Sequence, residues 1–407
     1  MENKKGLIIK FGEKSIDSKR MLILFVIIDL LVLPYIRAIH AGAGMIFVAL
    51  WCLPNIMKRV KEYTWIFAAF VAFSNLNGYL FHYVGTFGVT QAIMVIYGFV
   101  LLDFFAEADL EGNGGIIKKL LVLYIILTSA FAALYAMAPE EYFSIRSNWT
   151  MSDTQIEFTT MRINRFTSIF SDPNNAGAAL TALLAYILVY EDVKPLTLAV
   201  ICGCTFVCVV LTYSVTALIL FISVILFYLL LGSKAVEHKK KRITLFFVVC
   251  IAVGVCAEFI FAANADPSAN PYIYALQKRI EGNTEDSNLG GRIPRWKELL
   301  TTLSIWDCIL VGKGVVLDAN GKSFQPHNGL LFLLYSYGLP AVYLYLKKFY
   351  SFAQKRLIFY LPAIVIFVAV FINVGFSDYR FLTLSTLIIA LSKSKCKVLA
   401  EKAKKEA

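Results

Sequence analysis

The sequence predicts an all-α polytopic membrane protein with about twelve transmembrane helices and two long external loops. The chain has 407 residues, of which 58% are hydrophobic and 16% are charged. Its mean hydropathy is +0.68, and many of its apolar stretches approach the roughly 20 residues that a helix needs to cross the hydrocarbon. This composition excludes an ordinary soluble domain and a disordered chain. We therefore expect residues 1–407 to form a single integral membrane domain.

The apolar stretches follow one another almost from end to end. We expect helical spans at residues 21–36, 38–56, 63–81, 86–105, 116–136, 174–190, 195–212, 215–231, 243–262, 328–346, 357–375 and 379–391. Polar segments interrupt them at about residues 138–173 and 264–326, and a basic tail follows at residues 392–407. Loops of such length without regular structure are usually functional.

The basic residues predict the orientation of the chain. With the N-terminus inside the cell, 27 of the 39 lysines and arginines fall on cytoplasmic segments, as the positive-inside rule requires. Both termini are then cytoplasmic, and both long loops lie outside. The excess of positive charge is therefore a topology signal. The basic run at residues 239–242 is a cytoplasmic anchor beside anionic lipid, and we expect no nucleic-acid partner.

Arginine and lysine are distributed differently over the two sides. Eight of the 12 arginines fall outside, but only four of the 27 lysines do. The guanidinium group is a planar fork that binds phosphate or carboxylate through two hydrogen bonds. The retention of arginine outside therefore indicates anion recognition on that side. The first candidates are Arg165 and Arg292, and the others are Arg162, Arg279, Arg295 and Arg380.

Two expected spans begin where the two external loops end. Asp172 followed by Pro173 is typical of a helix cap and a first helical residue, so the span from Asn174 points its positive end outward. Another span starts at Asn328, directly after the second loop. Helix starts favour phosphate because their amide hydrogens lack partners within the helix. We therefore expect Asn174 and Asn328 to border an anion site.

The second loop contains an expected amphipathic helix, which begins near Arg292. Its apolar residues recur at helical spacing and are Trp296, Leu299, Leu300, Leu303 and Trp306. Such a helix lies on the membrane boundary. If the two loops fold over one another, Arg165, Arg292 and the start of the span at Asn328 converge.

His327 is the candidate general base beside these features. Histidine titrates near neutrality and is the usual acceptor of a hydroxyl proton. His40 and His82 lie in short turns, and His238 lies on the cytoplasmic side. The sequence contains no nucleotide-binding loop and no metal-binding motif, so we expect neither a cofactor nor a metal.

Two acids lie inside expected spans, Asp29 in the first and Asp103 near the inner end of the fourth. An acid within the membrane is a functional candidate, but it also needs a polar partner there. We favour the second reading, in which each pairs with a polar group on a neighbouring span.

Two stretches resemble a known family. Residues 165–177, RFTSIFSDPNNAG, are similar to the R-x-x-G-x-F-x-x-P-N stretch of the bacterial O-antigen ligase and O-antigen or capsule polymerase superfamily. Gly291-Arg292-x-x-x-Trp296, Gly312-Lys-Gly314 and His327-Asn328-Gly-Leu-Leu resemble that family's second large loop and the following span. The chain departs from the family at Ser168, which often is Gly, and at residues 213–216, where the family often has a Ser-Arg pair.

The resemblance implies a polytopic glycosyltransferase of the GT-C type in the bacterial plasma (inner) membrane. Such enzymes transfer a glycan from an undecaprenyl-diphosphate carrier to a hydroxyl at the outer leaflet, without a nucleotide or a metal. It implies that Arg165 and Arg292 engage the diphosphate and that His327 activates the acceptor. The implied partners are the lipid-linked glycan, membrane lipid and a chain-length regulator.

Three functions remain open at this point. We expect a polymerase that extends lipid-linked repeat units of lipopolysaccharide or capsule, because the second loop has a broad polar and aromatic surface for a glycan. An O-antigen ligase would instead move the glycan to a terminal acceptor such as lipid A core. A polysaccharide flippase or transporter would place its key polar groups near mid-membrane, whereas here they cluster outside.

The orientation can be tested by cysteine labelling in a chain without its eight native cysteines. A cysteine at Asn283 should react with an impermeant reagent on intact cells, because residues 264–326 are expected outside. A cysteine at Lys239 should react only after lysis. The reverse pattern would contradict the predicted orientation.

Overall fold

The computed structural model describes residues 8–11, 14–17, 26–30, 35–36, 41–81, 86–107, 110, 114–147, 155–158, 161–231, 243–248, 250–251, 254, 274, 292–302, 310–315, 326–373 and 375–406. Over this part of the chain the protein is helical, and its strands form three small antiparallel hairpins. The prediction of a helical protein is confirmed to that extent.

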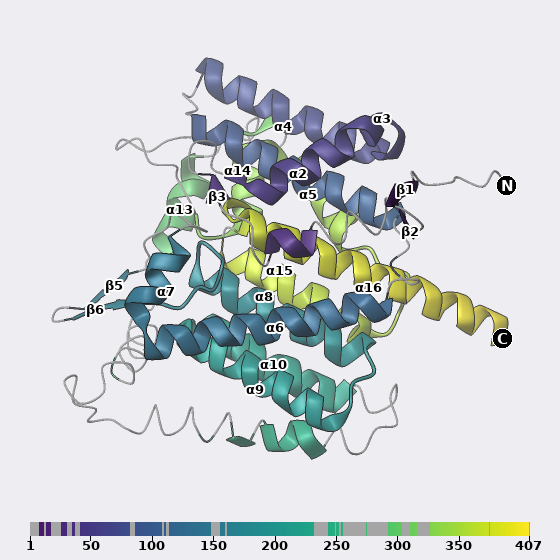
Figure 1. The fold of residues 1–407 in the computed structure, drawn as a ribbon. Helices are drawn as coiled ribbons and strands as arrows, with labels where there is room; N and C mark the ends of the chain where they lie inside the picture. Colours follow the sequence, from purple (N-terminus) through teal and green to yellow (C-terminus); the bar gives the residue numbers. More distant parts are fainter. Residues whose placement is uncertain are drawn as a thin grey trace.

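The helices form a bundle (Figure 1). They are α2 (Ala43–Cys52), α3 (Ile56–Arg59), α4 (Glu62–Phe81), α5 (Thr86–Glu107), α6 (Gly114–Met137), α7 (Pro139–Arg146), α8 (Pro173–Tyr190), α9 (Pro195–Leu211), α10 (Val215–Leu231), α13 (Arg292–Thr302), α14 (Gly329–Tyr350), α15 (Leu361–Ile372) and α16 (Tyr379–Glu406). Short 3-10 turns are η2 (Leu53–Asn55), η5 (Leu357–Tyr360) and η6 (Gly375–Ser377). The hairpins pair β1 (Ile8–Phe11) with β2 (Lys14–Asp17), β3 (Tyr35–Ile36) with β4 (Ala41–Gly42), and β5 (Gln155–Phe158) with β6 (Met161–Asn164).

Four helices of the described chain are long and apolar enough to cross a membrane. They are α4, Gly88–Ala106 of α5, Ile117–Met137 of α6, and α14. Large apolar side chains also remain exposed on the bundle, among them Tyr79 at 73% and Phe81 at 74%. Exposed apolar surface of this kind is unusual for a soluble monomer and suits contact with lipid.

Helix α8 is the central element of the bundle. It packs against α9, α10, α15 and α16, and its residues from Asn175 to Leu188 are all buried. Small residues make this close packing possible. A Cβ atom added at Gly177 would lie only 2.4 Å from the Cβ atom of Ala217 on α10. Asp172, which directly precedes α8, is therefore attached to a closely packed helix.

The described loop elements lie at opposite ends of the bundle (Figure 1). Helices α7 and α13 and the hairpin β5–β6 lie at the left of the view. Helix α3, the hairpin β1–β2 and the C-terminal end of α16 lie at the right. This arrangement agrees with two loops on one side and both chain ends on the other. The charge pattern, rather than the fold, assigns the second side to the cytoplasm.

The fold differs from the expected spans at three places. Helical structure is described at residues 26–30, but Tyr35–Ile36 and Ala41–Gly42 then form a hairpin instead of helix. The sequence has a proline at position 34, and proline lacks an amide hydrogen and disfavours helix before it. Helix α15 has 12 residues, fewer than a full crossing needs. Helix α16 continues as far as Glu406, so the basic tail extends the last span as helix.

We expect Gly177→Ala to destabilise the protein by about 1–3 kcal/mol, because the added methyl group overpacks the contact with α10. Gly203→Ala in α9 is the matched control. Nothing lies within 4 Å of a Cβ atom at Gly203, and alanine favours helix over glycine by about 1 kcal/mol. Thermal unfolding of the detergent-purified variants measures both effects. Equal unfolding temperatures for the two variants would contradict this account of α8 packing.

Candidate functional site

Three buried arginines lie in or against the segment 165–172, which leads into α8. Arg146 and Arg165 are each 6% exposed, and Arg380 is 1% exposed. Charged side chains are rarely so buried unless they are paired or hydrogen-bonded. Their contacts therefore define how this end of the bundle is built.

Each arginine holds a different part of the chain. The Nε atom of Arg165 donates to the carbonyl oxygen of Thr212 at 2.8 Å, and its Nη2 atom donates to Oδ1 of Asn174 at 3.3 Å. Arg165 thus ties the start of α8 to the turn between α9 and α10. The expectation that Arg165 and Asn174 lie together is confirmed.

The other two arginines bind the segment itself. Arg146, the last residue of α7, donates from Nε to Oγ1 of Thr167 at 2.6 Å. Arg380 in the first turn of α16 donates from Nη1 to the carbonyl oxygen of Ile169 at 2.9 Å. Arg380 therefore connects α16 with the first loop.

The carboxylate of Asp378 also binds the segment 165–172. Asp378 accepts hydrogen bonds at Oδ2 from the amide and hydroxyl of Ser171, at 2.7 and 2.8 Å. Its Oδ1 atom accepts from the amides of Arg380 and Phe381. Burial raises the pKa of the Asp378 carboxyl, and the hydrogen bonds from Ser171 and Phe381 oppose that shift. Because both carboxylate oxygens accept hydrogen bonds, Asp378 holds Ser171 against the start of α16.

The helix starts at this end are capped by the protein's own side chains. Asp172 caps α8 by accepting from the amides of Asn174 and Asn175, which confirms the cap expected from the sequence. Asn328 caps α14 in the same way, accepting from Leu330 and Leu331 at 3.0 Å. The expectation that these helix starts offer open amides to phosphate is therefore wrong for these four N–H groups. The anion binding expected at this end would therefore depend on the arginines rather than on these amides.

Backbone strain collects beside the same residues. Ser168, Tyr213 and His327 are the non-glycine residues with positive φ in the described chain, at 53°, 50° and 49°. Such conformations cost energy for residues with a Cβ atom and cluster at functional sites. A glycine at position 168 would adopt this backbone conformation without strain. The serine present there has a positive φ that residues with a Cβ atom disfavour.

The second loop returns into the bundle at residues 310–315. Pro340 has no amide hydrogen and α14 is interrupted at Gly338, so carbonyl groups of the preceding turn lose their helical partners. The amides of Lys313 and Gly314 donate to the carbonyl oxygens of Tyr335 and Ser336, both at 2.9 Å.

Glycine permits this approach of two backbones. A Cβ atom at Gly312 would lie 2.4 Å from the backbone of Ser336. Asn77 of α4 also donates to the carbonyl oxygen of Gly312 at 3.0 Å. The Gly-Lys-Gly motif at residues 312–314 therefore fastens the second loop between α4 and α14.

Helix α13 brings the second loop to the start of α14. The Nε1 atom of Trp296 donates to the carbonyl oxygen of Pro326 at 2.6 Å, next to His327. The Trp296 ring also lies edge-on to Phe371 of α15, with centroids 6.3 Å apart, and Leu299 is buried. Arg292 is the first residue of α13, one helical turn before Trp296. The helix expected here is thus confirmed over residues 292–302, and Leu303 and Trp306 lie outside the described residues.

The segment 370–376 joins the two halves of the site. A Cβ atom at Gly329, next to Asn328, would meet Val370 and Phe376. Asn373 donates from Nδ2 to Oδ1 of Asp172 at 3.2 Å and to Oδ1 of Asn175 at 3.0 Å. The start of α14 and the start of α8 therefore contact the same short segment. This supports the expected convergence of Arg165 with the end that carries His327.

The remaining expected residues are placed less fully. The structure describes the backbone of Arg162, in β6, and of Arg292, in α13. Arg295 is exposed on α13. Arg279, His40, His82 and His238 lie outside the described residues. His327 is half-buried, directly before the α14 cap.

The sequence interpretation missed Arg146 and Asn373. The spacing of Tyr142 and Arg146 does contain a signal, since residues four apart share one face of a helix. Tyr142 binds the same segment, because its hydroxyl accepts from the amide of Thr167 at 3.2 Å. Asn373 carries no local signal, since its partners lie 198 and 201 residues earlier in the chain.

Both acids within the expected spans have polar partners. Asp103 forms an ion pair with Lys348 at 2.8 Å and accepts from Thr64 at 2.5 Å. Asp29 accepts from the hydroxyl of Tyr379 at 3.4 Å. The expectation that each pairs with a neighbouring span is confirmed.

Comparison with protein-family models finds no match for this chain, and a search of curated proteins finds none either.

We expect Ser168→Gly to stabilise the protein by about 1 kcal/mol, because glycine adopts positive φ without the steric cost of a Cβ atom. Ser144→Gly is the matched control, since Ser144 is exposed on α7 and glycine should cost about 0.5 kcal/mol in a helix. Unfolding in detergent should therefore shift in opposite directions. Destabilisation by Ser168→Gly would show that the serine side chain matters more than the backbone conformation.

Proposed function

We propose that this chain is a GT-C-type membrane glycosyltransferase with about twelve spans. It would extend an oligosaccharide carried on undecaprenyl diphosphate at the outer leaflet of the bacterial plasma membrane. The observation that carries the proposal is the cluster of buried Arg146, Arg165 and Arg380 around the segment 165–172. The resemblance of that segment and of residues 291–338 to the O-antigen polymerase and ligase superfamily supplies the reaction.

The proposed reaction is displacement at the sugar carbon that bears the diphosphate. A hydroxyl oxygen of the acceptor sugar bonds to this carbon, the bond to the diphosphate oxygen breaks, and the diphosphate keeps the electron pair. Negative charge therefore grows on the leaving group. Arginine stabilises such charge well, because its fork is already oriented by other hydrogen bonds.

Arg165 is the residue best placed for this role. Its two described hydrogen bonds, to Thr212 and Asn174, fix its guanidinium beside the N-terminus of α8. Arg292 would supply a second positive charge from α13. Because the starts of α8 and α14 are capped by Asp172 and Asn328, the diphosphate depends on these arginines rather than on helix amides.

His327 would take the proton of the acceptor hydroxyl. Its position directly before Asn328 ties its backbone to the cap of α14, and Trp296 holds the neighbouring carbonyl of Pro326. The strained φ of 49° gives this residue a defined backbone direction. A protonated imidazole cannot accept a proton, so activity should fall as the pH drops below neutrality.

The deciding experiment is transfer by purified enzyme from a lipid-diphosphate-linked repeat unit. Arg165→Ala should lower the rate at least about a hundredfold, since one lost charge-stabilising group costs about 3 kcal/mol of the barrier. Arg165→Lys should recover only part of the rate, because lysine lacks the bidentate fork. Arg356→Ala is the control, as Arg356 is exposed at the other end of the bundle.

The same assay tests the base. His327→Ala should lose turnover but keep binding of the lipid-linked donor, because the arginines provide that binding. An active His327 variant would exclude this histidine as the base, and full activity of Arg165→Ala would exclude diphosphate stabilisation by Arg165.

The glycans of a strain that lacks the protein separate polymerase from ligase. Single unpolymerised repeats on the carrier would support the polymerase. Long chains that are not attached to a terminal acceptor would support the ligase.

A further inference from the structure

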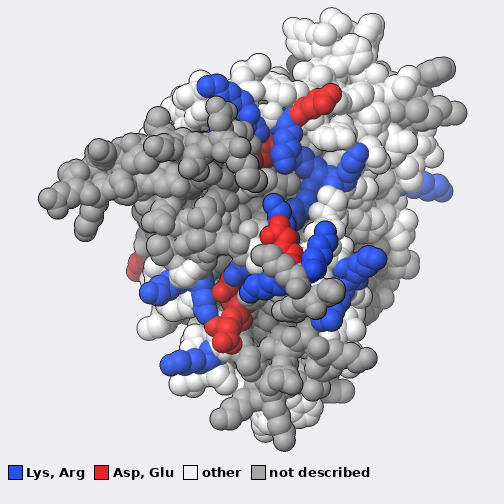
Figure 2. Space-filling model, turned by 90° about the vertical axis from the view of Figure 1, so that its right-hand side faces the viewer, with Lys and Arg blue, Asp and Glu red and all other residues white. Residues whose placement is uncertain are grey.

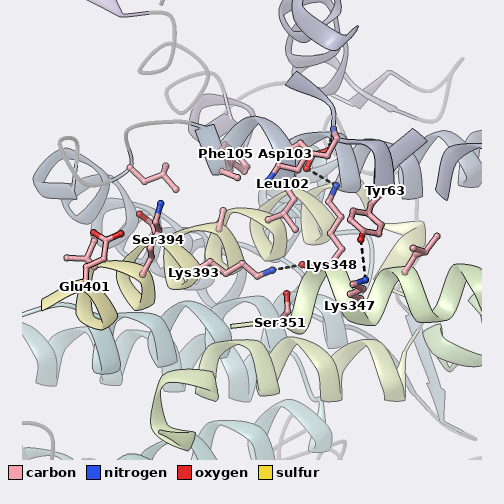
Figure 3. Close-up of a pocket in the computed structure, with 17 residues that line it drawn as sticks. Tyr63, Leu102, Asp103, Phe105, Lys347, Lys348, Ser351, Lys393, Ser394 and Glu401 are labelled. Carbon is pink, nitrogen blue, oxygen red and sulfur yellow. Dashed lines mark hydrogen bonds and ion pairs between the residues drawn. The ribbon is translucent and has the colours of Figure 1, made fainter. Parts of the chain in front are cut away.

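A cavity of about 690 Å³ lies at the end of the bundle opposite the arginine cluster (Figure 3). It is formed between α4, α5, α14 and α16. Lysines dominate its polar lining, and they are Lys61, Lys347, Lys348, Lys393 and Lys397. The acids in its lining are Asp103 and Glu401. The cavity thus holds more positive than negative charge, on a face where lysine and arginine gather (Figure 2).

Asp103 is already engaged inside the cavity. It pairs with Lys348 at 2.8 Å and also accepts from the backbone amide of Lys61 at 3.0 Å and the hydroxyl of Thr64 at 2.5 Å. Figure 3 shows the Lys348 side chain reaching from α14 to this carboxylate. The ion pair described for this acid is therefore with Lys348.

Lys393 is a half-buried amine whose described contacts include no carboxylate. Its Nζ atom donates to the backbone carbonyl oxygen of Lys348, and it lies 5.6 Å from the ring centre of Phe352. Burial and the charges of Lys348 and Lys61 lower the pKa of Lys393 to about 8. An anion in the cavity would relieve the repulsion among these ammonium groups.

Apolar side chains from three helices line part of the cavity and are called its apolar wall. Leu102 and Phe105 of α5, Leu344 of α14 and Val398 of α16 contribute to it. A small soluble anion makes no use of such a wall, whereas a lipid places a charged head group beside hydrocarbon. The expected cytoplasmic side of the membrane also carries anionic lipid.

We propose that this cavity binds one anionic phospholipid, with the head-group phosphate at Lys61, Lys393 and Lys397 and the adjoining chain against the apolar wall. Three positive side chains from two walls then contact one phosphate. Such a site lies apart from the proposed transfer site and does not depend on its chemistry. Basic pockets between transmembrane helices on this side are suited to anionic head groups.

Retention of lipid by the purified full-length protein tests the proposal. The protein in detergent is mixed with phosphatidylglycerol or with phosphatidylcholine, and native mass spectrometry counts bound lipid. The wild type should retain one phosphatidylglycerol in preference to phosphatidylcholine. Lys393→Gln with Lys397→Gln should weaken that binding about thirtyfold, as expected for two lysines near a lipid surface.

Lys402→Gln with Lys404→Gln is the matched control. Both lysines are exposed on α16 outside the cavity lining, and the pair removes the same charge from the same helix. Lys61→Gln provides an independent variant from another wall and should weaken binding about fivefold. The Lys61→Gln variant keeps the backbone amide of residue 61, so the hydrogen bond from this amide to Asp103 in the cavity lining is retained.

Equal retention of phosphatidylcholine, or equal loss of phosphatidylglycerol in the Lys402 and Lys404 control, would overturn the proposal. Displacement of the lipid by millimolar inorganic pyrophosphate would assign the cavity to a soluble phosphate compound and would also overturn it. Loss in the cavity variants alone, with no displacement by pyrophosphate, supports a specific lipid site.

Discussion

The carboxylate of Asp172 holds the end of the bundle on which the candidate site depends. Its Oδ1 atom accepts from the amides of Asn174 and Asn175 and from the side chain of Asn373. In an apolar bundle a helix start cannot rely on water, so its amides need partners within the protein. Asp172 provides them and at the same time ties the end of α15 to the start of α8. Removing this carboxylate would uncap the central helix and separate it from its neighbour.

The same solution recurs at the starts of α14 and α16. Asn328 caps the first and Asp378 the second, each from the position directly before the helix. Asp378 also binds Ser171, so it joins α16 to the first loop. Three self-capped helix starts thus form a frame, and the buried arginines attach the segment 165–172 to it. The frame explains why these arginines can be buried, since each donates to an oxygen of fixed position.

The local part of this arrangement could be predicted from the sequence, and the long-range part could not. Asp172-Pro173 contains its own cap signal, and the residue pattern after Arg292 indicated α13. By contrast, the role of the Gly-Lys-Gly motif depends on the missing amide hydrogen of Pro340 in a helix further along the chain. The hairpin of β3 and β4 follows Pro34 in the sequence. The apolar composition around this proline predicted continuous helical spans instead. Arg146 stood outside the expected candidates because only the fold brings α7 beside Thr167.

Helices α14 and α16 physically connect the two ends of the bundle. Helix α14 starts at the Asn328 cap and reaches Lys347 and Lys348 in the lysine-lined cavity. Helix α16 starts at Asp378 and Arg380 and reaches Lys393 and Lys397. The kink at Gly338 does not leave α14 unsupported, because Lys313 and Gly314 bind the carbonyl groups of the interrupted turn. Each helix therefore begins with a side-chain cap near the arginine cluster and carries cavity lysines towards its other end, where Lys393 of α16 donates to the carbonyl oxygen of Lys348 of α14.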